Sequence, residues 1–266
     1  MLLHFYKYQG TGNDFVILDN RNGLIDLTRE QVAFICHRRF GIGADGLMLL
    51  NTHAAYDFEM KYYNADGGES TMCGNGGRCL VKFAAEMGII KSEYRFIAID
   101  GEHEASIETN GHVSLKMNDV DTIRSNYNRH VLNTGSPHYV EVTDNVMSLD
   151  VFGKGRSIRY SDEFKKEGIN VNFVEYTAEP DTIVVRTYER GVEDETFSCG
   201  TGVTAAALVS FHNENGYNYV NVKTKGGLLG VEYEKDEDHY RNIHLIGPAT
   251  KVFEGDIQLP DIINYI

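Results

Sequence analysis

The sequence predicts an α+β fold of two similar domains, each with a curled, barrel-like β-sheet around a central helix. Three observations support this prediction. The motif Cys-Gly-x-Gly occurs twice, at residues 73–76 and 199–202, and each copy leads into an apolar helical segment. Other landmarks recur in the same order in both halves of the chain. Strand-like segments outnumber helical ones, and each half has only two predicted helices.

The recurring landmarks have nearly the same spacing in the two halves. From Thr11 to Cys73 is 62 positions, and from Thr134 to Cys199 is 65. This agreement in order and spacing predicts an internal duplication. The landmarks are the Thr-Gly loops at 11–16 and 134–140, the helices predicted over 28–40 and 161–167, the glycines at 41 and 168 that end these helices, and the two Cys motifs.

The domain boundary is predicted near residues 118–121. We expect the first domain to span residues 1–119, completed by the C-terminal segment 256–266, and the second domain to span residues 120–255. Alternating or apolar runs predict strands within both domains. These strands include residues 58–63, 113–117, 183–188 and 244–246.

The helices at 78–87 and 203–211, each directly after a Cys motif, are apolar or small-sided over most of their circumference. Such a pattern is typical of a helix surrounded by protein, and a curved sheet would enclose it. Gly88 and Gly216 are candidates for the glycines that end these two helices. In the first half, Thr28 and Gln31 fit a capping box at the start of the helix before Gly41.

Composition is that of an ordinary globular protein. The 266 residues are 42% hydrophobic and 24% charged, which argues against disorder. A formal net charge of −14 argues against nucleic acid as a partner, because few basic residues remain to neutralise phosphates. No apolar run approaches the length of a membrane span, and no secretory signal is visible at the N-terminus. We therefore expect a cytoplasmic protein with reduced cysteines and no membrane partner.

A thiol at a helix start suits proton transfer at a carbon next to a carboxylate. Removing that proton adds negative charge to the carboxyl oxygens, and each helix start offers free N–H groups and about half a positive charge. Glycines let the backbone approach a ligand closely. A helix start also lowers a thiol pKa from about 8.5 toward roughly 3.5–7.5.

Two such thiols near each other would hold one proton between them, so that one is base and the other acid. Cys73 and Cys199 are therefore the predicted acid/base pair, and neither a cofactor nor a metal is needed to explain them. Inert buried thiols and a redox pair are the alternatives, although no CxxC spacing supports the second. We interpret Cys36 and Cys79 as small buried hydrophobic residues.

Other segments have simpler interpretations. Residues 41–46 spell G-x-G-x-x-G, but they follow a helix and precede a strand, the reverse of a dinucleotide-binding loop, so we interpret them as a helix stop and turn. The ten histidines show no metal-ligand spacing. His138 lies in the repeated loop and has either a structural or a site-supporting role. Residues 189–191 are either a solvated turn or part of the cleft.

Several motifs together resemble those of the diaminopimelate epimerase family, over essentially the whole chain. The resemblance implies two pseudo-symmetric domains, each a mixed sheet curled around a central helix, with the substrate between them. It also implies cofactor-independent interconversion of LL- and meso-diaminopimelate for lysine and peptidoglycan biosynthesis, by a homodimer whose domains close over the substrate. The motifs are residues 10–15, 64–67, 73–79, 135–138, 188–191 and 199–202.

The resemblance also assigns the site residues. Cys73 and Cys199 would be the acid and base. The reacting carboxylate and α-amino group would be held by Gly74, Asn75, Gly200 and Thr201. The distal amino-acid end would be recognised by Asn13, Asn64, Asn170, Glu189 and Arg190. The arginine fork suits a carboxylate and the glutamate suits an ammonium group.

One position departs from the family pattern. The family loop is usually Gly-Asn-Pro-His, whereas this chain has Ser136 in place of the asparagine. Serine is shorter but keeps a hydroxyl group, so a substrate contact can be kept, including one through water. The alternative function is therefore a related two-thiol racemase acting on another amino acid, such as histidine or a hydroxyproline-like substrate. A thiol-redox or non-enzymatic binding protein is the alternative from a different class.

Overall fold

The computed structural model describes residues 1–210 and 214–260. Contacts divide the chain into two units: residues 1–115 with the described part of 248–266, and residues 116–247. The boundaries thus fall before residues 116 and 248, whereas the sequence placed them before 120 and 256. Residues 261–266 of the expected C-terminal segment lie outside the described residues.

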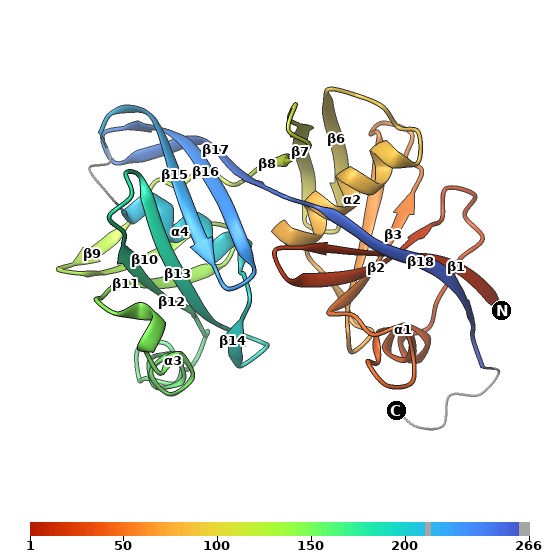
Figure 1. The fold of residues 1–266 in the computed structure, drawn as a ribbon, viewed down its shortest axis with the longest axis horizontal. Helices are drawn as coiled ribbons and strands as arrows, with labels where there is room; N and C mark the ends of the chain where they lie inside the picture. Colours follow the sequence, from red (N-terminus) through yellow and green to blue (C-terminus); the bar gives the residue numbers. More distant parts are fainter. Residues whose placement is uncertain (211–213, 261–266) are drawn as a thin grey trace. The chain divides into compact units, whose positions relative to one another are not determined.

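The first unit contains a mixed β-sheet and two helices (Figure 1). Its hydrogen-bonded strand order is β18-β1-β2-β3-β4-β6-β7-β8, in which β2–β3 and β4–β6 are parallel, the other pairs are antiparallel, and β5 adds to the end of β4. The elements are β1 (Leu2–Gly10), β2 (Asn13–Asp19), α1 (Arg29–Cys36), β3 (Gly46–Asn51), β4 (Phe58–Asn64), β5 (Glu69–Ser70), α2 (Gly74–Glu86), β6 (Glu93–Ala98), β7 (Gly101–Ile107), β8 (Val113–Lys116) and β18 (Thr250–Gln258).

The second unit repeats this topology. Its order is β9-β10-β11-β12-β13-β15-β16-β17, with β11–β12 and β13–β15 parallel and β14 added to β13. The elements are β9 (Arg124–Asn126), β10 (Arg129–Asn133), β11 (Pro137–Val142), the 3-10 helix η1 (Val146–Ser148), α3 (Val151–Arg159), β12 (Asn170–Tyr176), β13 (Thr182–Glu189), β14 (Asp194–Thr196), α4 (Gly200–Val209), β15 (Gly216–Thr224), β16 (Gly227–Asp236) and β17 (His239–Gly247). The predicted fold class is confirmed, and the matching strand orders agree with a duplication.

Each sheet curls around one helix of its own unit. Helix α2 contacts β1, β2, β3, β7 and β18, and α4 contacts β10, β11, β12, β13, β15, β16 and β17. Every residue from Val203 to Leu208 is buried, which explains why this helix is apolar all round. Figure 1 shows both helices lying among the strands of their units. The prediction of enclosed helices is confirmed.

The predicted start of α1 and the predicted end of α2 are confirmed, but the predicted end of α1 is not. The Thr28–Gln31 capping box is present, and Gly88 (φ 93°) follows α2, where the Gly88 and Ile89 N–H groups bond the carbonyls of Ala85 and Ala84. Helix α1, however, ends at Cys36, and residues 38–40 form a turn.

The glycine predicted to end α4 does not do so. The helix ends at Val209, before the expected end at residue 211, which lies outside the described residues. Ser210 donates its hydroxyl to the carbonyl of Ala206 (2.5 Å), so a side chain satisfies the last turn and no glycine is needed there. Gly216 instead begins β15.

The helix predicted over residues 161–167 is wrong, because this segment forms turns. The corresponding helix is α3, ten residues earlier, which Asp150 caps by accepting the N–H of Gly153 (2.9 Å). Two glycines inside α3 concealed its helical pattern. Gly155 is required by packing, since a Cβ there would lie 2.4 Å from the Cβ of Tyr188.

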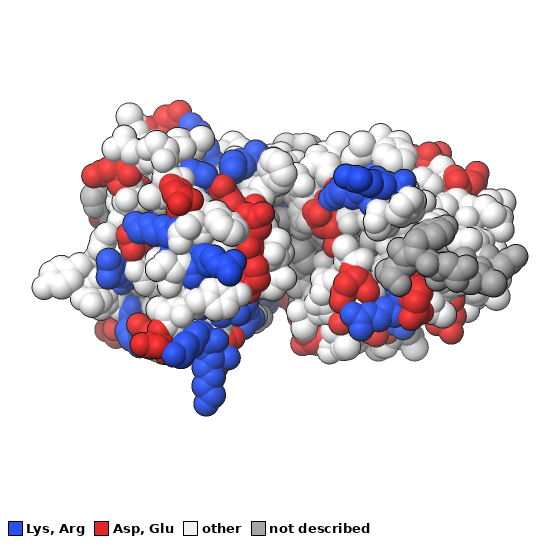
Figure 2. Space-filling model, turned by 90° about the horizontal axis from the view of Figure 1, so that it is seen from below, with Lys and Arg blue, Asp and Glu red and all other residues white. Residues whose placement is uncertain are grey.

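The surface carries acidic and basic side chains close together. Figure 2 shows acidic and basic side chains next to one another on the face of each unit that it draws. Ion pairs of the chain include Lys165–Asp162 (2.5 Å) and Lys154–Glu141 (2.7 Å). Among the residues described, no helix combines the length and apolarity that crossing a bilayer requires.

Candidate active site

Both motif cysteines occupy the position directly before a helix. Cys73 precedes α2 with an extended backbone (φ −94°, ψ 130°), and Cys199 precedes α4 in the same way (φ −112°, ψ 112°). Neither side chain caps its helix. The first N–H groups of each helix have no intrahelical partner, so each thiol lies beside the positive end of a helix dipole. The predicted placement of both thiols at helix starts is confirmed.

The thiol of Cys73 contacts an asparagine whose orientation is fixed. The Cys73 Sγ lies 3.5 Å from Oδ1 of Asn13, which also accepts from Nδ2 of Asn75 (3.4 Å). Nδ2 of Asn13 donates to a carboxylate oxygen of Asp45 (2.6 Å). Because a carboxylate only accepts, this bond turns the Asn13 carbonyl oxygen toward the sulfur. Arg38 in turn holds Asp45 (2.7 Å).

The residue after this asparagine, Asp14, belongs to an ion-pair network that also includes Asp45. Asp14 pairs with Lys7 (2.6 Å) and Arg38 (2.7 Å), and its backbone N–H donates to Asp45. Burial raises the pKa of Asp14, but hydrogen bonds and charge from Arg38 and Lys7 outweigh burial and lower the pKa to about 2. Asp14 is therefore ionised at neutral pH, and Lys7 and Arg38 both pair with it.

The start of α4 is tied to the repeated loop of the second unit. The Cys199 Sγ lies 3.5 Å from the hydroxyl oxygen of Thr201. The hydroxyl of Thr134, in that loop, donates to the carbonyl of Thr201 (2.8 Å). Gly202 has to be glycine, because a Cβ there would lie 2.3 Å from Oδ1 of the buried Asn172.

His138 is buried and neutral. Nδ2 of Asn172 donates to Nδ1 of His138 (3.1 Å) and to the Tyr139 carbonyl (3.0 Å), while Thr187 donates its hydroxyl to Oδ1 of Asn172 (2.9 Å). The His138 proton is therefore assigned to Nε2. Burial, with a smaller effect of the Arg190 charge, lowers the pKa of His138 to about 3.

Three residues predicted to contact the substrate, Ser136, Asn170 and Arg190, form one cluster. Nδ2 of Asn170 donates to the Ser136 hydroxyl oxygen (2.9 Å), and Nη2 of Arg190 donates to the same oxygen (3.3 Å). The Arg190 backbone N–H donates to Oδ1 of Asn170 (2.9 Å). Since the Ser136 oxygen accepts twice, its own proton is available as a donor. Glu189 is the last residue of β13, directly before Arg190.

Asn64 differs from this cluster. It ends β4, and its backbone bonds Gly68 and Gly67 across a turn. Its side chain is exposed and makes no hydrogen bond to the residues that the structure describes.

Comparison with known proteins identifies the family. A family model described as diaminopimelate epimerase matches two separate stretches, residues 5–123 and 130–252. The chain is 49% identical over 259 residues to a diaminopimelate epimerase of Flavobacterium psychrophilum, covering 96% of this chain and 100% of the relative. The chain belongs to the diaminopimelate epimerase family.

A second member of the diaminopimelate epimerase family, from Chlorobaculum tepidum, is 47% identical over 261 residues, with 94% of this chain and 99% of the relative covered. Solved structures of more distant proteins share the fold. A Bacillus anthracis phenazine biosynthesis protein of the PhzF family has a TM-score of 0.77 at 14% identity, covering 97% of this chain and all of that chain. A hydroxyproline epimerase from Agrobacterium vitis has a TM-score of 0.65 at 13% identity, covering 98% and 93%. At these identities the likeness concerns the fold alone.

Membership in the diaminopimelate epimerase family makes the chain an isomerase. The other two cysteines are structural, as expected: Cys36 and Cys79 are buried, and burial raises the pKa of each to about 12. Among the described residues, no group of three or more His, Cys, Asp or Glu could hold a metal ion.

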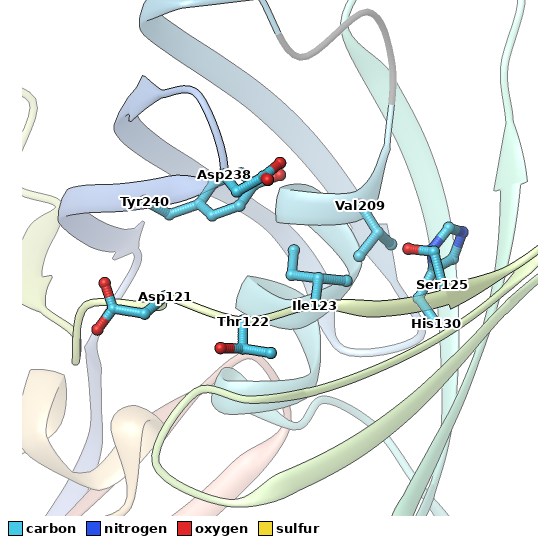
Figure 3. Close-up of a pocket in the computed structure, with 8 residues that line it drawn as sticks. All are labelled: Asp121, Thr122, Ile123, Ser125, His130, Val209, Asp238 and Tyr240. Atoms are coloured by element: carbon cyan, nitrogen blue, oxygen red, sulfur yellow. The ribbon is translucent and has the colours of Figure 1, made fainter.

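A cavity in the second unit lies away from these residues. It measures about 310 Å³, and Figure 3 shows its lining, which includes none of the predicted site residues. Its polar side chains include Asp121, Thr122, Ser125, His130 and Asp238, and Val209 lines it from the end of α4. We assign the cavity no part in the chemistry.

Sequence reasoning missed two residues that support the site, Asp45 and Asn172. Both occur within the repeated segments that follow Gly41 and Gly168, so their place in the repeat was the available signal. Cys73 belongs to the first unit and Cys199 to the second, and their approach across one substrate stays a prediction.

Proposed function

We propose that this protein interconverts LL- and meso-diaminopimelate without a cofactor, using Cys73 and Cys199 as acid and base. The observation that supports this most strongly is the matched position of the two thiols. Each is the residue before the enclosed helix of its unit, in two units with the same strand order. A duplicated unit that supplies one thiol per copy is suited to a reaction with two proton-transfer groups.

In the proposed reaction, the thiolate of one cysteine removes the α-proton from one face of the substrate carbon. The thiol of the other cysteine donates its proton to the opposite face, which inverts the configuration. The C–H bond that breaks and the one that forms balance, and the pair ends with the proton on the other sulfur. The opposite direction uses the same groups in reversed roles.

The helix starts would stabilise the charge that develops on the carboxylate. Gly74 and Asn75 at α2, with Gly200 and Thr201 at α4, would hold the carboxylate and the α-amino group. Backbone N–H groups fixed by a helix need no reorganisation as charge grows, so they favour the transition state over the ground state. Asn13, whose carbonyl oxygen faces the Cys73 sulfur, would also orient that thiol.

The cluster around Ser136 would recognise the distal end of the substrate. Arg190 suits the distal carboxylate and Glu189 the distal ammonium group, with Asn64, Asn170 and Asn13 completing the polar lining. The Ser136 hydroxyl, whose oxygen already accepts from Asn170 and Arg190, would donate its proton to the same carboxylate. A second zwitterionic end distinguishes diaminopimelate from smaller amino acids.

The second candidate is a two-thiol racemase for another amino acid, such as histidine or a hydroxyproline-like substrate. Ser136, which replaces the asparagine usual in the family, is the observation that favours it. We further propose a cytoplasmic homodimer that serves lysine and peptidoglycan biosynthesis, on the support of the family resemblance.

Hydrogen exchange at the substrate α-carbon tests both candidates. Purified protein in heavy water, with no added cofactor, should incorporate deuterium into LL- and meso-diaminopimelate, as measured by mass spectrometry. Exchange with histidine or hydroxyproline but not with diaminopimelate would select the second candidate. No exchange with any of these amino acids would contradict both.

A further inference from the structure

Arg78 is a buried cation that has no acidic partner. It lies in the second turn of α2 and is 0% exposed, and no carboxylate of the described residues is within ion-pair distance of it. A buried charge without a counter-ion is strongly destabilising, and a cation near a helix start is opposed by the helix dipole as well. The fold therefore keeps Arg78 at a cost.

The guanidinium group binds the segment that presents Cys73. Nη1 donates to the carbonyl of Gly74 (3.3 Å), and Nη2 donates to Oδ1 of Asn75 (3.0 Å) and to the hydroxyl of Thr11 (3.3 Å). These are neutral acceptors, so the charge of Arg78 is not compensated by them. Nε has no hydrogen-bond partner among the described residues.

Two thiols are the titratable groups that interact electrostatically with Arg78, those of Cys73 and Cys79. Cys79 is fully buried and, with its high pKa, stays neutral. The other carboxylates near the helix start have partners of their own: Asp14 pairs with Lys7 and Arg38, Asp45 pairs with Arg38, and Asp100 contacts His103 (3.3 Å). Among the described residues of this unit, Cys73 is thus the group whose negative charge Arg78 can balance.

In the second unit, the position that matches Arg78 holds no cation. Five residues after Cys199, at the position matching Arg78, stands Thr204, whose hydroxyl donates to the Gly200 carbonyl (3.0 Å). His138 is neutral, and the guanidinium of Arg190 is hydrogen-bonded at the Ser136 loop. The starts of α2 and α4 therefore have similar backbone conformations, but only α2 has a cation at the fifth residue after its cysteine.

We propose that Arg78 is the counter-ion of the Cys73 thiolate and makes Cys73 the more acidic of the two thiols. This inference rests on the proposed acid/base role of Cys73. Cys73 then has a partner in each protonation state. The protonated thiol donates to Oδ1 of Asn13, and the charge of the thiolate is balanced by Arg78. Arg78 acts through Cys73 and Asn75, so it is a positioning residue that need not touch the substrate.

The pH dependence of thiol alkylation tests this proposal without substrate. In full-length Cys199→Ala protein, the rate at which iodoacetamide alkylates Cys73 is measured against pH by peptide mass spectrometry. The midpoint is the pH at which the alkylation rate reaches half of its maximum. Adding Arg78→Met should raise the Cys73 midpoint by about one pH unit or more. At a fixed pH below the midpoint, this corresponds to a roughly tenfold loss of thiolate. In a Cys73→Ala background, Arg78→Met should leave the Cys199 midpoint unchanged.

Two variants serve as controls. Arg78→Lys keeps the charge and should restore most of the low Cys73 midpoint. Thr204→Val, at the matched position of α4, should move neither midpoint. An unchanged Cys73 midpoint in folded Arg78→Met protein, with folding checked by circular dichroism, would overturn the proposal and leave Arg78 a structural role.

If Arg78→Met does not fold, two proteins that keep Arg78 still test the proposal. The Cys73 midpoint in Cys199→Ala protein should then lie below the Cys199 midpoint in Cys73→Ala protein. An equal or higher Cys73 midpoint would refute the proposal. Because no substrate is present, this result is independent of whether diaminopimelate exchanges its α-proton.

Discussion

At the scale of single residues, several side chains of the candidate site have an orientation that a neighbour fixes. Asp45 turns the carbonyl oxygen of Asn13 toward Cys73, and Asn172 fixes the neutral tautomer of His138. Neither Asp45 nor Asn172 carries out chemistry in the proposed reaction. Each removes an alternative side-chain orientation, so that the site needs little reorganisation when charge develops.

Single replacement of either motif cysteine should abolish epimerisation. Each of Cys73→Ala and Cys199→Ala removes one of two proton-transfer groups, and we expect activity to fall about 100-fold or more. Cys36→Ala is the matched control, because Cys36 is a buried thiol outside the site. Epimerisation is followed by chiral chromatography. More than a few per cent of activity in either motif variant, with the fold intact, would argue against two acid/base groups.

The ion pairs of Asp14 predict a pH dependence of stability. Its pKa is about 2 in the folded protein and near 3.8 when unfolded, so the stabilisation is complete above about pH 5 and is lost as pH falls toward 2. The side chain is only 19% exposed, and the loss is about 2 kcal/mol of unfolding free energy.

Urea unfolding between pH 5 and pH 2 measures this loss, with Asp14→Asn as the comparison. The variant should be less stable at pH 7 and should show a shallower decline in acid. Equal declines in the two proteins would show that Asp14 does not contribute.

At the scale of elements, the duplicated strand–helix unit places the two thiols, and packing decides which residues can follow them. The glycines three residues after each cysteine are equivalent in sequence but not in surroundings. A Cβ at Gly202 would lie 2.3 Å from the Oδ1 of Asn172, whereas one at Gly76 would lie 3.3 Å from the flexible Met48 side chain.

Gly202→Ala should therefore be destabilising and Gly76→Ala should be tolerated. Asn172 is held by several hydrogen bonds and cannot move aside, so we expect a loss of about 1–3 kcal/mol. At Gly76 the better helix propensity of alanine offsets mild crowding, leaving a change within about 1 kcal/mol. Urea unfolding midpoints compare the variants. A larger loss at Gly76 would contradict this account of the two helix starts.

At the scale of the whole molecule, the repeated order of landmarks made the fold predictable. Spacing between the Thr-Gly loops and the Cys motifs revealed the duplication, and the apolar circumference of the Cys-linked helices predicted their enclosure. The predictions of helix α3 and of the end of α4 were wrong, because local packing and side-chain bonding there differ from the usual sequence patterns. Gly155 against Tyr188 hid helix α3, and Ser210 replaced the expected glycine at the end of α4.

The site was predictable only in part, for a physical reason. Residues inside the motifs could be named, but Asp45, Asn172 and Arg78 contribute through contacts with residues distant in sequence. Arg78 belongs to the motif at 73–79, so its position could be named, but α2 also contains Lys82 and Glu86, and nothing in the sequence set Arg78 apart from them. Its burial could not be read from the sequence, because it depends on how the sheet encloses α2.

The proposed reaction requires that the two motif thiols can meet across one substrate-sized gap. Mild oxidation of the purified protein, followed by peptide mass spectrometry and an activity assay, tests this most directly. We predict a Cys73–Cys199 disulfide, loss of activity in step with its formation, and recovery of both on reduction. Oxidised protein in which these two cysteines never join, or in which the joined form stays fully active, would contradict it.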